Sequence, residues 1–122
     1  MLKPLPNSNL VNEGMRKRFS DDSSSLTLWF DERGGIFGIE IIFDLLVDEH
    51  AFRWIQGTTT RYVKVEVLPP RPGRHPKQAL DPENLPLPRS RLEDFDERSG
   101  NLLPAWRDFI RAKLLEMIGQ SA

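Results

Sequence analysis

The stretch LTLWFDERGGIFGIEIIFD, residues 26–44, decides the fold of this chain. Its first part, LTLWF, has an apolar residue at every second position, which is the period of a β-strand. The pair Gly34-Gly35 follows, and glycine accepts the positive φ angles that a tight hairpin turn requires. Alternation then resumes in IFGIEIIF. The stretch therefore predicts an antiparallel β-hairpin.

Both faces of this hairpin carry apolar side chains. We expect one face to consist of Leu26, Leu28, Phe30, Phe37, Ile39, Ile41 and Phe43. We expect the other face to hold Trp29, Ile36 and Ile42 around Glu40. Apolar residues on both sides are typical of a central strand that is covered above and below.

Two further strands are expected toward the C-terminus. HAFRWI, residues 50–55, alternates, and GTTT can turn the chain into RYVKVEVL, residues 61–68. The second of these strands puts Val63, Val65 and Val67 on one face and Tyr62, Lys64 and Glu66 on the other. Pro69 and Pro70 end it, because proline lacks the N–H group that a strand ladder needs.

The segments on either side of the sheet are less regular. Residues 1–24 form an N-terminal arm in which MRKRF is either a short edge strand or a basic arm. Residues 69–91 form a proline-rich connector, which favours extended or polyproline II geometry because it contains seven of the ten prolines. RLEDFDERSG, residues 91–100, is acidic and is either one helical turn or a loop.

The C-terminus predicts an amphipathic helix over residues 102–119. Its apolar residues recur with the i, i+3, i+4 spacing of one helical face: Leu103, Trp106, Phe109, Ile110, Leu114, Met117 and Ile118. Asn101 is a candidate cap, Pro104 suits the first turn, and Gly119 is a natural stop.

These elements predict a single α+β domain, in which a four-stranded antiparallel meander over residues 26–68 packs one face against the C-terminal helix. The alternation does not tell which face takes the helix. The second face then needs a cover. The candidates are the proline-rich segment, the N-terminal arm and a second copy of the protein.

The order of the pieces resembles a group of small bacterial proteins built from a hairpin, further strands and a C-terminal helix. The resemblance rests on WFDERGGIFGIEIIFD, HAFRW, YVKVE and LPAWRDFIRAKLLE, and it covers residues 26–68 and 102–118. The linker here is longer and richer in proline than in that group. The resemblance implies a compact bacterial α+β domain and implies no activity or site residue.

Composition excludes several functional classes. A chain of 122 residues with a formal net charge of -1 has no global positive field to attract nucleic acid or an anionic membrane. The absence of cysteine excludes disulfides and cysteine-ligated zinc. The start lacks the apolar core of a signal peptide, and Glu40 and Asp44 interrupt the longest apolar region. We expect a cytoplasmic protein without a membrane span.

One cluster of residues has acid–base or metal chemistry. It consists of Asp44, Asp48, Glu49 and His50, and carboxylates beside an imidazole can hold a divalent ion or a water molecule. The spacing matches no ligand motif, and a solvated turn has the same composition. We expect no cofactor and no enzymatic activity.

A basic region overlaps the last strand and continues beyond it. It comprises Arg61, Lys64, Arg71, Arg74 and Lys77, with Tyr62 as a base-stacking candidate, and would make a modest nucleic-acid surface. Pro69, Pro72 and Arg74 also match the P-x-x-P-x-R order of polyproline ligands, but we favour a role as a spacer or a sheet-covering segment, because proline-rich chains act as stiff connectors.

Two functional hypotheses result. The first is a non-enzymatic domain that binds a protein partner through the second sheet face, with a homodimer as one form of that contact. The alternative is a small nucleic-acid-associated protein that uses the basic region.

Overall fold

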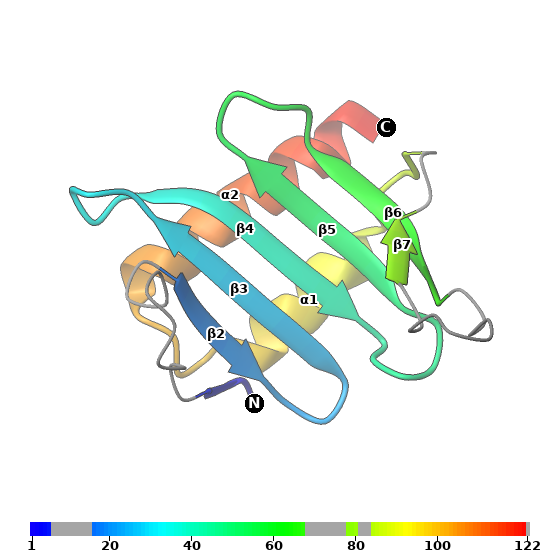
Figure 1. Ribbon diagram of the computed structural model, residues 1–122, viewed down its shortest axis with the longest axis horizontal. Coiled ribbons are helices and arrows are strands. Elements are labelled where there is room, and N and C mark those ends of the chain that lie inside the picture. The colour runs from blue at the N-terminus through cyan, green and yellow to red at the C-terminus, as the bar shows by residue number, and fades with distance from the viewer. Residues whose placement is uncertain (6–15, 68–77, 81–83, 122) are drawn as a thin grey trace, which may run out of the picture.

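Figure 1 shows the computed structural model of the protein, which describes residues 1–5, 16–67, 78–80 and 84–121. Its strands are β1 (Lys3–Pro4), β2 (Arg16–Ser20), β3 (Ser24–Phe30), β4 (Ile36–Phe43), β5 (His50–Ile55), β6 (Arg61–Val67) and β7 (Gln78–Leu80). The helices are α1 (Arg89–Arg98) and α2 (Pro104–Ser121). All strands pair antiparallel with their neighbours in chain order, so the sheet is a meander. The predicted α+β class and antiparallel sheet are confirmed.

The predicted count of four strands is wrong, because the sheet has seven within the described residues. The four predicted strands correspond to β3, β4, β5 and β6. The additional strands are β1, β2 and β7. They lie at the two edges of the sheet. β2 has a weak pattern, since Phe19 is its one apolar side chain and packs in the core opposite Leu26.

Both helices lie on the same face of the sheet, behind it in Figure 1. The sheet contributes Leu26, Leu28, Ile39, Ile41, Phe43 and Phe52 to the core between them, and all are buried. The helices contribute Leu92, Phe95, Ile110, Leu114 and Met117. The apolar face of the strands and the apolar face of α2 therefore pack together in one layer. Burial of this apolar area is the main term that stabilises the fold.

Aromatic side chains fix the position of α2 across the strands. The ring centroids of Trp106 and Phe30 are 5.4 Å apart, and those of Phe109 and Trp54 are 5.3 Å apart. Because Phe30 lies on β3 and Trp54 on β5, the first turns of α2 span the centre of the sheet. Such edge and tilted ring contacts stabilise by about 0.5–1.5 kcal/mol beyond the area they bury.

The helix boundaries differ from the expected ones in three places. α1 begins at Arg89, inside the range expected to be a connector. α2 runs through Gly119 to Ser121, so the predicted stop is wrong; a Cβ at Gly119 would meet no atom within 4 Å. Asn101 does not cap α2, because its side-chain amide donates to the carbonyl of Leu2.

A register shift moves one residue to the opposite face from the expected one. The pairing of β3 with β4 shifts between Trp29 and Phe30, so that Trp29 lies opposite Gly38 whereas Phe30 lies opposite Ile36. Ile36 therefore packs against the core on the helix side. The expectation that it shares a face with Ile42 is wrong, because a bulge inserts an extra residue into the alternation.

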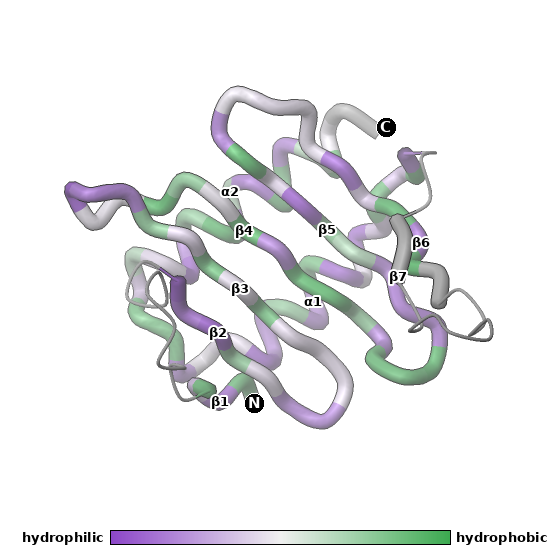
Figure 2. Tube along the Cα trace, in the orientation of Figure 1, coloured by the Kyte–Doolittle hydropathy of each residue, from purple (hydrophilic) through white to green (hydrophobic). Residues whose placement is uncertain are grey.

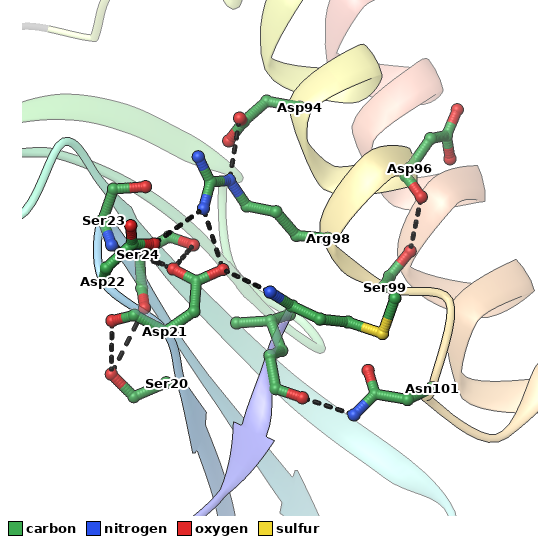
Figure 3. A network of polar contacts seen from close by, with 12 residues as sticks. Ser20, Asp21, Asp22, Ser23, Ser24, Asp94, Asp96, Arg98, Ser99 and Asn101 are labelled. Carbon is green, nitrogen blue, oxygen red and sulfur yellow. Dashed lines mark hydrogen bonds and ion pairs between the residues drawn. The ribbon is translucent and has the colours of Figure 1, made fainter.

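A polar network ties the β2–β3 turn to the last turn of α1 (Figure 3). The carboxylate of Asp21 accepts hydrogen bonds from the amides of Ser23 and Ser24, both at 2.9 Å. It also pairs with Arg98 at 2.8 Å, and Arg98 donates to Asp94 at 2.9 Å. Each charge in this group has an opposite charge beside it, which is the arrangement of a structural link.

Neither of the two described helices is long and apolar enough to cross a membrane.

Candidate functional site

The face of the sheet opposite the helices carries no described helix, and we call it the open face (Figure 1). Its side chains from β2 to β6 are the alternate residues to those of the core: Arg16, Arg18, Ser20, Ser25, Thr27, Trp29, Gly38, Glu40, Ile42, Ala51, Arg53, Ile55, Arg61, Val63 and Val65. Figure 2 shows the corresponding change between hydrophilic and hydrophobic residues along these strands.

The open face is organised into cross-strand rows. From β2 to β6, the charged row reads Arg18, Thr27, Glu40, Arg53 and Arg61. On one side of it lies a row of Arg16, Trp29, Gly38 and Ile55. On the other side, Ala51, Val63 and Val65 form a small buried apolar cluster with Ile42 packed against it. The charged row therefore lies between a row in which Trp29 and Ile55 accompany Arg16 and a small apolar cluster that is buried.

Gly38 makes room for the large side chains of its row. A Cβ at this position would lie 3.0 Å from Cε3 of Trp29 and 2.9 Å from Cδ1 of Ile55. At these distances the end of the Ile55 side chain would have to shift and the Trp29 ring would have to move by a few tenths of an ångström. The glycine thus lets Trp29 and Ile55 approach each other over β4, which is how an aromatic residue covers a glycine in a sheet.

The charged residues of the open face are mostly cations. Four arginines face one acid, Glu40, although the whole chain has a net charge of -1. Glu40 contacts Arg53 at 3.8 Å, a long ion pair whose side chains are 25% and 43% exposed. Among the described side chains of the open face, arginines therefore outnumber acids, whereas the whole chain has a net charge of -1.

A hollow of about 340 Å³ lies at the β5–β6 end of the open face. It is lined by Arg53, Ile55, Thr58, Thr59 and Arg61, and we call it the Arg53–Arg61 hollow. The two arginines are directly opposite each other in the register. Nε of Arg53 is buried and has no hydrogen-bond partner among the described residues.

The turn that closes this hollow depends on glycine. Gly57 has a φ of 84°, a left-handed conformation that favours glycine. The amide and the hydroxyl of Thr58 both donate to the carbonyl of Ile55, at 3.0 and 2.9 Å. The turn is thereby held in one conformation, and Thr59 remains as the second threonine of the hollow.

The structure separates the described members of the predicted basic region. In the strand register, Arg61 lies opposite Arg53 on the open face, whereas Lys64 lies opposite His50 on the helix side. Lys64 also contacts Asp48 at 4.0 Å. These two cations therefore do not share a surface. The other predicted members, Arg71, Arg74 and Lys77, lie outside the described residues, as do Pro69 and Pro72.

The predicted acidic cluster occupies the loop between β4 and β5. Asp44 pairs with Arg91 at 2.9 Å, and Glu49 accepts a hydrogen bond from the amide of Leu46. The carbonyl of Asp48 lies 2.9 Å from Nδ1 of His50. In the part of the chain that the structure describes, no three acidic or histidine side chains are placed to hold a metal ion.

Arg91 links this loop to α1. Its side chain donates to Asp44 at 2.9 Å and to the hydroxyl of Tyr62 at 3.0 Å. Burial lowers the pKa of Arg91, but these two hydrogen bonds outweigh burial and raise it. The loop tip beyond it carries two fully apolar exposed residues, Leu46 and Val47, visible as the green loop after β4 in Figure 2.

A second hollow, of about 280 Å³, lies where β1 and β2 meet α2. Pro4, Leu5, Phe19 and Trp106 line it together with Lys17 and Arg18. The ammonium group of Lys17 lies 5.3 Å from the ring of Trp106. Since its cation is already paired with an aromatic ring of the same chain, this hollow is a weaker candidate than the Arg53–Arg61 hollow.

Comparison with known proteins gives no indication of function, so the functional argument rests on the geometry of the structure. No protein-family model, curated protein or solved structure matches this chain.

Arg53 is the site residue that sequence reasoning missed, although a signal for it exists. Arg53 and Arg61 are each four residues from Gly57, so a hairpin centred on that glycine places them opposite each other. Strand parity also separates Arg61 from Lys64, because an odd spacing in a strand puts two side chains on opposite faces.

Proposed function

We propose that this chain is a non-enzymatic protein-binding domain whose open face docks an acidic segment of a partner protein. The observation that carries the proposal is the arrangement of the sheet. Both helices cover one face, and the described side chains of the other face include more arginines than acids beside the partly exposed Trp29, Ile42 and Ile55. A surface that combines cations with partly exposed apolar residues is complementary to a segment that combines acids with apolar residues.

The composition of the open face supports a protein partner. Tryptophan and arginine are the residue types enriched at the energetically important centres of protein interfaces. Here Trp29 is partly exposed, and its row runs directly beside the charged row of Arg18 and Arg53. The partly exposed side chains of Trp29, Ile42 and Ile55 supply apolar area, and the arginines select partners of opposite charge.

Self-association through the open face has less support. Two copies packed face to face bring four arginines against four, and like charges placed together across an interface are unfavourable. A nucleic acid is the other anionic partner. Against it, Arg61 and Lys64 diverge to opposite faces of β6, and the net charge of -1 gives no long-range attraction.

Titration of the ¹⁵N-labelled chain with an oligoglutamate peptide that carries interspersed leucines tests the proposal. We expect saturable shifts of the Trp29 indole N–H and of the β2–β6 amides. The indole signals of Trp54 and Trp106 should stay in place, because both rings pack on the helix side. A Trp29→Phe variant assigns the signal.

Three results would contradict the proposal. The first is a spectrum that does not change with the peptide. The second is a shift pattern confined to the helices. The third is saturation of the same face by oligothymidylate when the peptide fails, which would favour the nucleic-acid alternative.

A further inference from the structure

We infer that the tip of the loop between β4 and β5, formed by Leu46 and Val47, inserts into an apolar pocket of a partner protein that cationic side chains border. This contact is separate from the open face and goes beyond the docking of an acidic segment there. Leu46 is 96% exposed and Val47 is 87% exposed, more than any other large apolar residue in the described part of the chain. Two adjacent apolar side chains in water add nothing to folding, whereas their burial against a partner is favourable.

The backbone conformation of Leu46 is the first step of the argument. Its φ is 65°, in the left-handed region, where Cβ comes too close to the following carbonyl oxygen. Asparagine adopts this conformation more readily and also prefers water. Leucine is therefore unfavourable here both in φ and in exposure. Strain of this kind is found at contact sites, where a side chain has a role that the fold alone does not require.

Hydrogen bonds hold the tip in this conformation. The amide of Leu46 donates to the carboxylate of Glu49 at 3.0 Å. The amides of Val47 and Asp48 both donate to the carbonyl of Asp44, at 3.1 and 3.2 Å. A loop that is ordered before it binds loses little conformational entropy on insertion, so more of the apolar burial appears as affinity.

Acidic side chains border the tip. Asp48 is 60% exposed, and its contact with Lys64 is 4.0 Å long with a lysine that is 51% exposed, which makes a weak ion pair. The amide of Leu45 donates to the carbonyl of Ser23 at 3.0 Å, so the β2–β3 turn adjoins the loop. Asp22 in that turn is 93% exposed. A partner that surrounds the tip therefore meets two exposed carboxylates.

The cations of the adjoining turn are shared among several acids. Arg98 contacts Asp21 at 2.8 Å, Asp94 at 2.9 Å and Asp22 at 3.5 Å, so that one guanidinium group meets three carboxylates. The N-terminal ammonium group adds a contact with Asp21 at 3.8 Å. Asp22 has the longest of the three contacts with Arg98, and it gains most from a cation that a partner supplies.

These features together favour a protein pocket over a lipid surface. Both environments accept the apolar side chains of the tip. Insertion into a membrane, however, brings Asp22 and Asp48 against headgroup phosphates, and like charges placed together are unfavourable. A concave pocket with lysine or arginine at its border matches the apolar tip and the acids at the same time.

Two cyclodextrins test the inference on the whole chain. β-Cyclodextrin offers an apolar cavity, and its per-aminated form adds a ring of ammonium groups at the mouth of that cavity. We expect saturable shifts of the Leu46 and Val47 methyl signals, with nuclear Overhauser contacts to the inner wall of the cavity. The aminated form should bind about threefold more tightly than the neutral form at low salt, and added salt should reduce this advantage.

A pair of asparagine variants separates contact from strain. Leu46→Asn and Val47→Asn should each weaken binding of the aminated cyclodextrin about tenfold, equivalent to about 1.4 kcal/mol. Leu46→Asn should also raise the urea concentration at the unfolding midpoint, because asparagine tolerates a φ of 65°. Val47 has no positive φ, so Val47→Asn should leave the midpoint unchanged. Leu103→Asn, which removes a leucine that is 55% exposed elsewhere, should change binding less than about twofold.

Each outcome supports or overturns one part of the inference. Methyl signals that do not shift, or binding that Leu46→Asn retains at the wild-type level, would overturn the contact. Equal affinity for the two cyclodextrins at low salt would overturn the cationic border, and a lower urea midpoint for Leu46→Asn would overturn the strain. Binding to phosphatidylcholine vesicles that Leu46→Asn abolishes would assign the tip to a lipid surface instead. Failure of the oligoglutamate peptide to bind the open face would leave all of these results unaffected.

Discussion

Asp21 is the residue on which several parts of the fold depend. Its side chain is 5% exposed, and its carboxylate joins the β2–β3 turn to α1 through Arg98 at 2.8 Å (Figure 3). The same carboxylate binds the amides of Ser23 and Ser24. An aspartate that closes its own turn and also pairs with a distant helix cannot be identified from DDSSS alone, because the helix partner is 77 residues away.

Asp21→Asn should therefore destabilise the protein. The amide side chain retains an oxygen for the turn amides but loses the ion pair with Arg98, and we expect the free energy of unfolding to fall by about 2 kcal/mol. Urea unfolding followed by circular dichroism measures this change. Asp22→Asn is the matched control. Asp22 is 93% exposed, so its change should stay within about 0.5 kcal/mol. Equal effects of the two variants would contradict the role given to Asp21.

The same carboxylate makes stability depend on pH in the acid range. Burial raises the pKa of Asp21, but hydrogen bonds from Ser23, Arg98 and Ser24 outweigh burial and hold it below the ordinary 3.8. A carboxyl group whose pKa is lower in the folded than in the unfolded state stabilises the fold at pH values above its unfolded-state pKa. That contribution is lost as the pH falls through the folded-state pKa. We expect the urea concentration at the unfolding midpoint to decrease as the pH is lowered below about 4. The fall should be shallower in Asp21→Asn, and parallel curves for the two proteins would contradict this.

At the scale of elements, the strength of the apolar pattern decides what can be predicted. β3, β4, β5 and β6 are predictable because apolar residues recur at every second position on at least one face of each. For α1 the sequence does not decide between one helical turn and a loop, because Leu92 and Phe95 are its only buried apolar residues within an acidic run. Packing against the sheet and α2 stabilises this helix, and packing partners are not readable from a local segment.

The candidate site was predictable in one respect and not in another. Strand parity gives the second face, including Trp29 and Arg53, and the hairpin centred on Gly57 gives the pairing with Arg61. The bulge beside Trp29 was not predictable, because the sequence alternates through it without a break. That bulge removes Ile36 from the open face, which consequently has one apolar side chain fewer at this position than the alternation indicates.

A substitution at Gly38 tests how closely the side chains of Trp29 and Ile55 pack over β4 on the open face. Gly38→Ala adds a Cβ at 2.9 Å from Ile55 and 3.0 Å from Trp29, so the indole must move. We expect a loss of about 1 kcal/mol in unfolding free energy and a shift of the Trp29 indole signal.

The control is a glycine in open surroundings. Gly119→Ala in α2 meets no atom within 4 Å and replaces glycine with a better helix former, so it should stabilise by about 0.5 kcal/mol. Gains in stability from both alanines would contradict the packing argument for Gly38.

For the whole molecule, the arrangement of charge matters more than its sum. Acids gather in the loops at the strand ends: Asp21, Asp22, Asp31, Glu32, Asp44, Asp48 and Glu49. The centre of the open face holds the arginines and Glu40. A chain with a net charge of -1 thus has acids at its strand ends and arginines on its open face. Electrostatic attraction of a partner then acts at short range, because 0.1 M salt largely screens exposed charges that are more than about 10 Å apart.

The open face can be covered by an acidic partner or by a second copy of the chain, and added salt should affect the affinity of these two contacts in opposite directions. An acidic partner is held by attraction, so added salt should raise the Kd of the leucine-containing oligoglutamate peptide. A second copy must overcome repulsion among four arginines on each side, so added salt should favour that dimer. We therefore expect sedimentation equilibrium to give a monomer at low salt, with peptide binding strongest under the same conditions. A chain that dimerises at low salt and dissociates as salt is added would mean that copies associate through opposite charges. The excess of arginines on the open face would then not decide what covers it.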